Sequence, residues 1–403
     1  MAHHRAAGGG RGIRRNAIAY RGVSRGLVFV LLSIVLVAGI VVAWLQLGDH
    51  LDRQADQAAA TCVEGHATVA VIADPDLVDG LTAIAREFAD SKPVVRDHCI
   101  SIAVRAGDAK VTLDGLTGTW DTASLGQFPA AWVPQSSVWS AQLATTAPTA
   151  IEGSPQSLVI SPVVLATSPA LASKFNARLD WAALPMLQWR DASLREFGLT
   201  GWGSIRMALP IGGQSDASAL AAQAVAMRVT HTTGTLTAAD ARSPRVASSI
   251  RAMLTGPASP DGTPTGAATT IRDAADPATA SIHAVPITEQ RLYQLTRTDS
   301  IARLSEVIPS GPTPVADYPV IRLAGDRVPD FASDAVAQFF TFAAAPDHLR
   351  LLTGFGFRGD APLPKATPTV SFPITNDPMA SPENAAIVTI NKLVFGAGIG
   401  PSA

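Results

Sequence analysis

The stretch TVAVIADPDLVDGLTAIAREFADSKPVVRDHCISIAV, residues 68–104, decides the fold class of this chain. It begins and ends with short apolar runs, 68–73 and 100–104, that have the length of buried strands. Between these runs, apolar side chains recur at the spacing of one helix face: Leu77, Leu81, Ile84, Ala85 and Phe88. The pattern predicts a strand–helix–strand unit whose two strands are parallel neighbours.

The two cysteines of the chain flank this unit. Cys62 precedes the first strand and Cys99 precedes the second, so parallel pairing would bring both strand starts side by side. In an oxidising compartment the simplest expectation is a disulfide between them. Zinc coordination is the alternative, but it needs further ligands, and only His66 and His98 lie nearby in the sequence.

Strand-like and helix-like segments alternate along the rest of the chain, which indicates an α/β fold. The expected strands are 130–133, 158–165, 205–209, 282–286, 303–308 and 319–323. The first further helix is expected to begin after Ser136. The others are expected over 179–189, 216–228, 246–254, 289–295, 330–344, 347–352 and 382–395. Three prolines and three glycines in 256–266 predict a surface loop.

The segment 27–47 predicts where the protein is located. It is an uncharged run of 21 residues, close to the length that crosses a bilayer as a helix. Six arginines precede this run, whereas only Arg53 follows it closely. By the positive-inside rule the N-terminus is cytoplasmic and the C-terminal part extracytoplasmic, as in a single-pass protein of the cell membrane. We expect a cytoplasmic basic tail over 1–25, a transmembrane helix over 26–47 and a stalk over 48–61.

A cleaved signal peptide is the alternative for the same segment. Signal peptides have shorter apolar cores that end beside a small-residue cleavage site. The best such site here, 58–60, lies well downstream of the apolar run. Length and flanking charge therefore favour an uncleaved anchor.

Net charge and missing motifs argue against several classes of function. The formal net charge is −2, and the basic excess lies in the N-terminal tail. No basic patch with interleaved aromatic residues points to nucleic acid. Phosphate-binding-loop, His-Glu-x-x-His and EF-hand motifs are absent from the sequence, so we expect no cofactor.

Several short segments together resemble one known arrangement. They are the paired cysteines, AWVPQSSVW at 131–139, SPVVLA at 161–166, AVPITEQ at 284–290 and GFR at 356–358. In this order they resemble the membrane-anchored, type II periplasmic (extracellular solute)-binding-like domain of bacterial substrate-binding/von Willebrand factor A domain proteins. The sequence lacks the Asp-x-Ser-x-Ser metal loop of the von Willebrand A half. We therefore expect the binding half alone, without a metal site.

The resemblance implies two α/β lobes joined by crossover strands near Val164 and Val285, preceded by one transmembrane helix. The solute-binding-like domain would span 62–358. Its lobe 1 would comprise 62–165 and 286–358, and its lobe 2 would comprise 166–285. Residues 359–403 would form a C-terminal extended segment.

Ligands of open α/β sheets bind beyond the carboxyl ends of strands, where helices begin. Serines follow the expected strand that ends at Val133, and a Gly-Gly-Gln-Ser turn follows the one that ends near Leu209. A third such position is the start of the helix that follows the strand near Val285. The candidate ligand-binding residues are Ser136, Ser137, Gly212, Gly213, Gln214, Ser215, Thr288 and Glu289. The alternative for the serines is plain helix capping, and for Glu289 a favourable charge at a helix N-terminus.

These observations predict a non-catalytic protein that binds a small polar or anionic ligand between its lobes and serves a transporter or an envelope protein. The first alternative is a structural or interaction module of the cell envelope, with a cleft filled by Trp, Phe or the C-terminal segment. The second is a hydrolase with Ser215 as nucleophile, because Gly213–Ala217 partly matches the Gly-x-Ser-x-Gly motif of a nucleophile elbow. That alternative also needs an acidic residue and a histidine base. The candidates are Asp317 or Asp334 for the acid and His348 for the base.

Overall fold

The computed structural model describes residue 44 and residues 62–175, 178–374 and 377–396. The expected basic tail, transmembrane helix and stalk, 1–61, lie outside the described residues apart from Trp44. Within the described part of the chain, no helix is both long and apolar enough to cross a bilayer. The described residues from Cys62 onward belong to one compact unit.

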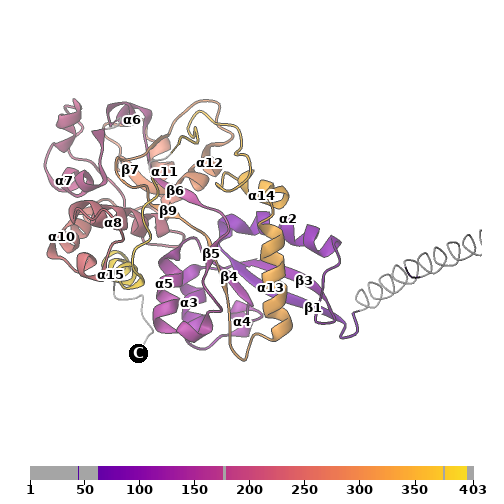
Figure 1. The fold of residues 1–403 in the computed structure, drawn as a ribbon. Helices are drawn as coiled ribbons and strands as arrows, with labels where there is room; N and C mark the ends of the chain where they lie inside the picture. The colour runs from indigo at the N-terminus through magenta and orange to yellow at the C-terminus, as the bar shows by residue number, and fades with distance from the viewer. Residues whose placement is uncertain (1–43, 45–61, 176–177, 375–376, 397–403) are drawn as a thin grey trace, which may run out of the picture. The chain divides into compact units, whose positions relative to one another are not determined.

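The first sheet is built around the predicted strand–helix–strand unit (Figure 1). Strand β1 (His66–Ala73) pairs in parallel with β3 (His98–Ala106) on one side and β4 (Ala131–Val133) on the other. The short strands β2 (Val94–Val95), β10 (Pro319–Arg322) and β5 (Gln156–Ser157) complete the order β2-β3-β1-β4-β10-β5. The register places Cys99 opposite His66, as expected for strands that start side by side.

Helix α2 (Pro75–Asp90) connects β1 to β3, and its sequence explains both its start and its packing. Asp74 caps its N-terminus and Pro75 occupies its first turn, where a missing N–H costs nothing. The predicted apolar face is buried, from Leu77 to Phe88. The chain then returns from β3 past β1 to β4, in the direction opposite to the first connection. Right-handed crossovers therefore place α2 and α3 (Ala109–Thr117) on opposite faces of the sheet.

The second sheet has β6 (Ser161–Thr167) at its centre. It pairs antiparallel with β7 (Ala284–Thr288), β8 (Ser305–Val307) and β9 (Val315–Ala316). All seven residues of β6 are buried, which fits its nearly unbroken apolar sequence. Helices α8 (Asp216–Val229), α11 (Pro264–Arg272) and α12 (Glu289–Thr296) pack on this sheet.

The change from one sheet to the other differs from the expected lobe boundaries. The boundaries after residues 165 and 285 fall inside β6 and β7, and both strands belong wholly to the second sheet. The chain changes sheet between β5 and β6 and returns between β9 and β10.

The expected helices are present, with ends shifted by a few residues. They include α5 (Ser137–Thr146), α7 (Leu184–Trp189), α10 (Pro244–Met253), α13 (Asp330–Ala343) and α14 (Pro346–Thr353). Helices not expected from the sequence are α3, α11, α4 (Thr122–Leu125), α6 (Pro169–Phe175) and α9 (Ala238–Ala241). The expected strand 205–209 is reduced to a single parallel bridge between Met207 and Ala284. Pro210 ends the pairing there, because it has no N–H to donate.

The C-terminal segment folds back on this chain rather than extending away from it. Its proline-rich first part lies against the second sheet, where Met379 N–H donates to the carbonyl of Thr313 (2.8 Å). It ends in α15 (Asn384–Phe395), which packs against α5, α8 and α9. The buried Asn391 amide donates to the Val138 carbonyl (3.2 Å) and ties α15 to α5.

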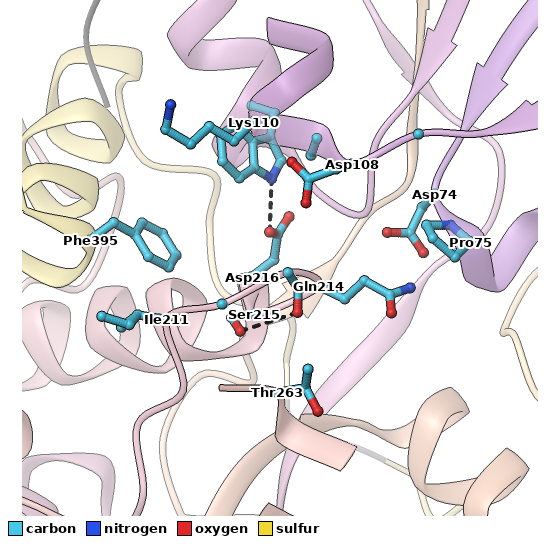
Figure 2. Close-up of a pocket in the computed structure, with 15 residues that line it drawn as sticks. Asp74, Pro75, Asp108, Lys110, Ile211, Gln214, Ser215, Asp216, Thr263 and Phe395 are labelled. Carbon is cyan, nitrogen blue, oxygen red and sulfur yellow. Dashed lines mark hydrogen bonds between the residues drawn. The ribbon is translucent and has the colours of Figure 1, made fainter. Parts of the chain in front are cut away.

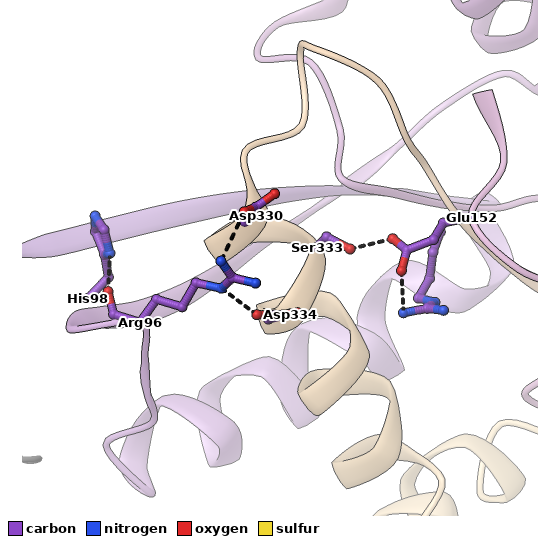
Figure 3. Close-up of polar contacts among 7 residues, drawn as sticks. Arg96, His98, Glu152, Asp330, Ser333 and Asp334 are labelled. Atoms are coloured by element: carbon purple, nitrogen blue, oxygen red, sulfur yellow. Dashed lines mark hydrogen bonds and ion pairs between the residues drawn. The ribbon is translucent and has the colours of Figure 1, made fainter. Parts of the chain in front are cut away.

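Polar contacts at the surface hold α13 against the first sheet (Figure 3). Arg96, in the turn between β2 and β3, donates to Asp334 (2.6 Å) and Asp330 (2.9 Å) at the start of α13. Ser333, between these aspartates, donates to Glu152. All these charges are at least partly exposed, so their contribution to stability is small.

Cys62 and Cys99 form the expected disulfide, which closes a loop across the β1–α2–β3 unit with a sequence separation of 37 residues. Their thiols are thereby unavailable to zinc. A loop of this length restricts the unfolded chain by about 4 kcal/mol in the chain-entropy account.

We predict that the double variant Cys62→Ser/Cys99→Ser has a free energy of unfolding lower by about 4 kcal/mol. Urea unfolding followed by tryptophan fluorescence measures the difference. A reductant should destabilise the wild-type chain similarly and leave the double variant unchanged. Equal stability of the two proteins would show that the bridge does not restrict the unfolded chain.

Candidate functional site

A cavity of about 500 Å³ lies where four helices begin (Figure 2). Two of these helices, α2 and α3, follow strands β1 and β3 of the first sheet. The other two, α8 and α11, pack on the second sheet. The cavity therefore lies beyond the carboxyl ends of parallel strands, the position where ligands of open α/β sheets bind. Its volume is in the range of small-molecule sites.

The predicted turn Gly212, Gly213, Gln214 and Ser215 lines this cavity. Glycine is needed at 212, because a Cβ there would lie 2.8 Å from the carbonyl oxygen of Gly262. The Gly212 N–H donates to the same carbonyl (3.0 Å), which joins the turn to the segment before α11. Gln214 has a positive φ of 56°, and its side-chain nitrogen is buried without a hydrogen-bond partner among the described residues.

Asp216, the first residue of α8, joins this turn to the first sheet. Its two carboxylate oxygens accept hydrogen bonds from the hydroxyl of Ser136 (2.6 Å) and the ring N–H of Trp139 (2.8 Å), both in or next to α5. Burial raises the pKa of Asp216 to about 6, and the two hydrogen bonds oppose that rise. Ser136 also caps α5, because its hydroxyl accepts from the Val138 N–H (3.3 Å).

A second contact between the halves is made by Arg291 of α12, whose side chain is 7% exposed. Its guanidinium donates to Asp76 of α2 (2.6 Å) and to the backbone carbonyl of Gln214 (3.1 Å). This charged group thus holds the cavity-lining turn and the start of α2 together. Removing it would leave the mostly buried Asp76 carboxylate unpaired, which is costly.

Asp74 is a second buried acid on the cavity wall, with 4% of its surface exposed. Desolvation by burial, followed by the charge of Asp76, raises its pKa to about 8, while the Arg291 charge opposes the rise. Its side chain accepts one hydrogen bond among the described residues, from the Asp76 N–H to Oδ1 (2.9 Å). Oδ2 has no protein donor there.

The other predicted site residues lie outside the cavity lining, with their polar groups engaged elsewhere. Ser137 donates both its N–H (2.7 Å) and its hydroxyl to Asp317. Thr288 caps α12 by accepting from the Arg291 N–H (3.3 Å). Glu289 is fully buried in a two-fold ion pair with Arg358, both contacts being 2.7 Å. For Ser136 and Thr288 the capping alternative describes the observed contacts, whereas Ser137 is the first residue of α5 and is held by Asp317.

Several lining residues were missed by the sequence analysis. Asp74 and Asp108 follow β1 and β3 and cap α2 and α3, so the same strand-end rule would have found them. Thr263 lies inside the expected loop, where Thr-Pro is in fact the start of α11. Trp139 and Phe395 form one wall with ring centroids 6.4 Å apart, and no local pattern brings α15 to this place.

The residues required for a hydrolase do not come together. The Ser215 hydroxyl donates only weakly to the carbonyls of Gly262 (3.4 Å) and Gly213 (3.5 Å), and no histidine contacts it among the described residues. His348 bonds the Phe342 carbonyl (2.7 Å), and Asp334 is paired with Arg96. Among the described residues, no three His, Cys, Asp or Glu side chains are grouped for a metal ion.

No family model matches the sequence. Two uncharacterized proteins of Mycobacterium tuberculosis, from strains CDC 1551 and H37Rv, are each 35% identical to this chain over 405 residues. The alignment covers 99% of this chain and 58% of each relative, so the chain spans little more than half the length of the curated relatives it matches.

Solved structures share the fold at low sequence identity. Iron-bound HitA from Pseudomonas aeruginosa superposes with a TM-score of 0.54 at 13% identity, covering 81% of this chain and 99% of that one. A ferric binding protein from Campylobacter jejuni gives 0.56 at 10% identity, with 82% and 99% covered. The fructose-6-phosphate-bound periplasmic binding protein AfuA from Actinobacillus pleuropneumoniae gives 0.50 at 12%, with 83% and 99% covered. The expected α/β, type II periplasmic-binding-protein-like fold is thereby confirmed.

We predict that Asp74→Asn changes the pH dependence of stability. The pKa of Asp74 is raised in the folded protein, so its contribution is full below the unfolded pKa of about 4 and is lost as pH rises through about 8. Relative to wild type, the variant should therefore gain stability across this window. Urea unfolding at a series of pH values measures the difference between the two proteins. The exposed Asp79→Asn, on the same helix, is the matched control and should show no such trend. Parallel curves for Asp74→Asn and wild type would contradict the prediction.

Proposed function

We propose that the protein is a membrane-tethered, extracytoplasmic solute-binding protein that binds a small polar ligand without catalysis. One observation carries the proposal: the cavity of about 500 Å³ lies between the two sheets, at the N-termini of four helices. A cavity of this volume with a few polar groups on an apolar wall is typical of a small-molecule site. The sequence alone is also compatible with an anionic ligand.

In the proposal, the ligand contacts the turn from Gly212 to Ser215 on one side and the starts of α2 and α3 on the other. Asp216 and Arg291 then act indirectly, because they hold the turn against α5 and α2. Solute-binding proteins commonly close two lobes around a ligand by a hinge. The crossings between β5 and β6 and between β9 and β10 are where such a hinge would lie.

The comparisons support solute binding through the shared fold. HitA is bound to iron, the Campylobacter jejuni protein is a ferric binding protein, and AfuA is bound to fructose-6-phosphate. A partner in the membrane, either a transporter or another envelope protein, would receive the ligand or respond to it. The proposed anchor over 26–47 and the disulfide fit an extracytoplasmic site.

One observation favours the alternative of an envelope interaction module. Trp139 and Phe395 line the cavity, and Phe395 belongs to the C-terminal segment. These are the residue types expected to fill a degenerate cleft. They leave a cavity of about 500 Å³, however, so they form a wall rather than a plug.

We predict that a small solute raises the midpoint of thermal unfolding of the full chain in mild detergent. A ligand that binds only the folded state stabilises it by about 2.7 kcal/mol at one hundred times its dissociation constant. The panel would include sugars, sugar phosphates, amino acids, amines, cell-wall fragments and ferric citrate. Ala109→Phe, which places a ring in the cavity wall, should abolish the shift.

Ala123→Phe is the matched control, because Ala123 is exposed on α4 outside the cavity. This variant should retain the shift in full. A shift that survives in folded Ala109→Phe would place the ligand elsewhere. A panel without any shift would favour the interaction-module alternative.

The anchor has its own test. We predict that the full chain stays in the membrane fraction after alkaline carbonate washing, and that deletion of residues 1–47 releases it. Mass spectrometry of the membrane-bound protein should find the N-terminal region intact. A shorter mature protein in the soluble fraction would support the signal-peptide alternative instead.

A further inference from the structure

The charges around the cavity restrict the chemistry of its ligand. Three carboxyl-bearing side chains line the wall: Asp74, Asp108 and Asp216. The one basic side chain on the wall is Lys110, but its ammonium is paired with Asp114 (2.6 Å) on the outer side of α3. Figure 2 shows the Lys110 side chain extending away from Asp108 and Asp74. Among the described lining residues, no unpaired cation faces the cavity.

The helix N-termini do not offset this excess of acids, because two of them are already occupied. Asp74 Oδ1 accepts from the Asp76 N–H at the start of α2, and Asp108 Oδ1 accepts from the Val111 N–H (2.9 Å) at the start of α3. Each helix thus has a carboxyl group of its own where a bound anion would otherwise lie. An anionic ligand would have to compete with these two carboxyl groups for the helix N-termini.

Asp74 also has a carboxyl oxygen without a hydrogen-bond donor in the described part of the protein. It is 4% exposed, its Oδ2 lacks a protein donor among the described residues, and it faces the cavity. Figure 2 shows Gln214 extending from the opposite wall toward Asp74. Its buried side-chain nitrogen has no hydrogen-bond acceptor among the described residues either. Within the described part of the chain, Asp74 thus leaves an acceptor and Gln214 a buried donor without a protein partner, and both residues line the cavity.

We infer that the ligand is a small organic cation, whose protonated amine is held by Asp74 and Asp108 and whose apolar body lies against Trp139 and Phe395. This inference rests on the proposed function, since it names the ligand class of the same cavity. The ammonium donates to the unpaired oxygens of the two carboxylates. The Trp139–Phe395 wall supplies apolar surface and an indole face that attracts a cation.

The buried groups around Asp74 fit this assignment. The acids Asp76 and Asp216 and the buried Tyr318 lie near it, whereas Arg291 is the cation among them. Burial and the neighbouring acids keep Asp74 largely protonated below its pKa of about 8. A cationic ligand supplies the missing positive charge, so Asp74 loses its proton to the solvent when the ligand binds.

The test uses three probes with nearly the same body and different end groups: tyramine (ammonium), tyrosol (hydroxyl) and 4-hydroxyphenylacetate (carboxylate). Agmatine is added as an aliphatic amine. Isothermal titration calorimetry with the full chain in mild detergent measures each affinity. Tyramine or agmatine should bind with a dissociation constant at least about tenfold lower than the neutral and anionic probes.

Asp74→Asn should raise the dissociation constant for the amines about ten- to a hundredfold, and Asp79→Asn should leave it unchanged. Asp108→Asn, at an exposed position that is safe for folding, should also weaken amine binding. Titrations at about pH 7 in buffers with different ionisation heats should show proton release in wild type and none in Asp74→Asn.

The outcomes separate this inference from the proposed function. If tyrosol, 4-hydroxyphenylacetate or a sugar phosphate binds as well as the amines, the cation assignment is overturned and solute binding stands. The same holds if amine affinity is unchanged in Asp74→Asn and Asp108→Asn. If no amine and no member of the wider panel binds, both proposals fail.

Discussion

The arrangement of this protein depends on a buried carboxylate that joins two sheets. Asp216 starts α8 on the second sheet, yet both of its oxygens are bound by donors from α5 on the first. A buried acid of this kind is costly unless its lone pairs are satisfied, so the hydroxyl of Ser136 and the ring N–H of Trp139 are tied to one position. Arg291 adds a second link, to Asp76 and to the turn before α8. The cavity is the space that remains beside these contacts.

Local sequence patterns predicted the strands and helices whose formation depends on nearby residues. The apolar runs and the helical spacing between 68 and 104 specify β1, α2 and β3, and the strand starts specify the disulfide. Elements defined by distant partners were less predictable. The segment 205–209 has the apolar pattern of a strand, but it forms one isolated bridge, between Met207 and Ala284, and Pro210 follows. The start of α11 falls inside the expected loop 256–266, because its Pro, Gly and Thr content hides a capped start at Thr263.

In the candidate site, too, residues with local signals were predictable and contacts with distant groups were not. The turn from Gly212 to Ser215 was found because a strand-like segment and a helix flank it. Thr288 and Glu289 have the same local signature, yet they serve a cap and a buried ion pair. Sequence alone does not distinguish these cases, since the distinction depends on whether a distant group such as Arg358 reaches the helix start. The charge of the cavity wall is likewise non-local, because Asp74, Asp108 and Asp216 come from three different helix starts.

The wall formed by Phe395 has a thermodynamic consequence. Phe395 is the last residue of α15, and α15 is held to the rest of the domain by packing against α5, α8 and α9. A ligand that contacts this ring would make part of its binding free energy with a helix that belongs to neither sheet. By thermodynamic reciprocity, an occupied cavity would strengthen the docking of α15, and a substitution that weakens this docking would weaken ligand binding.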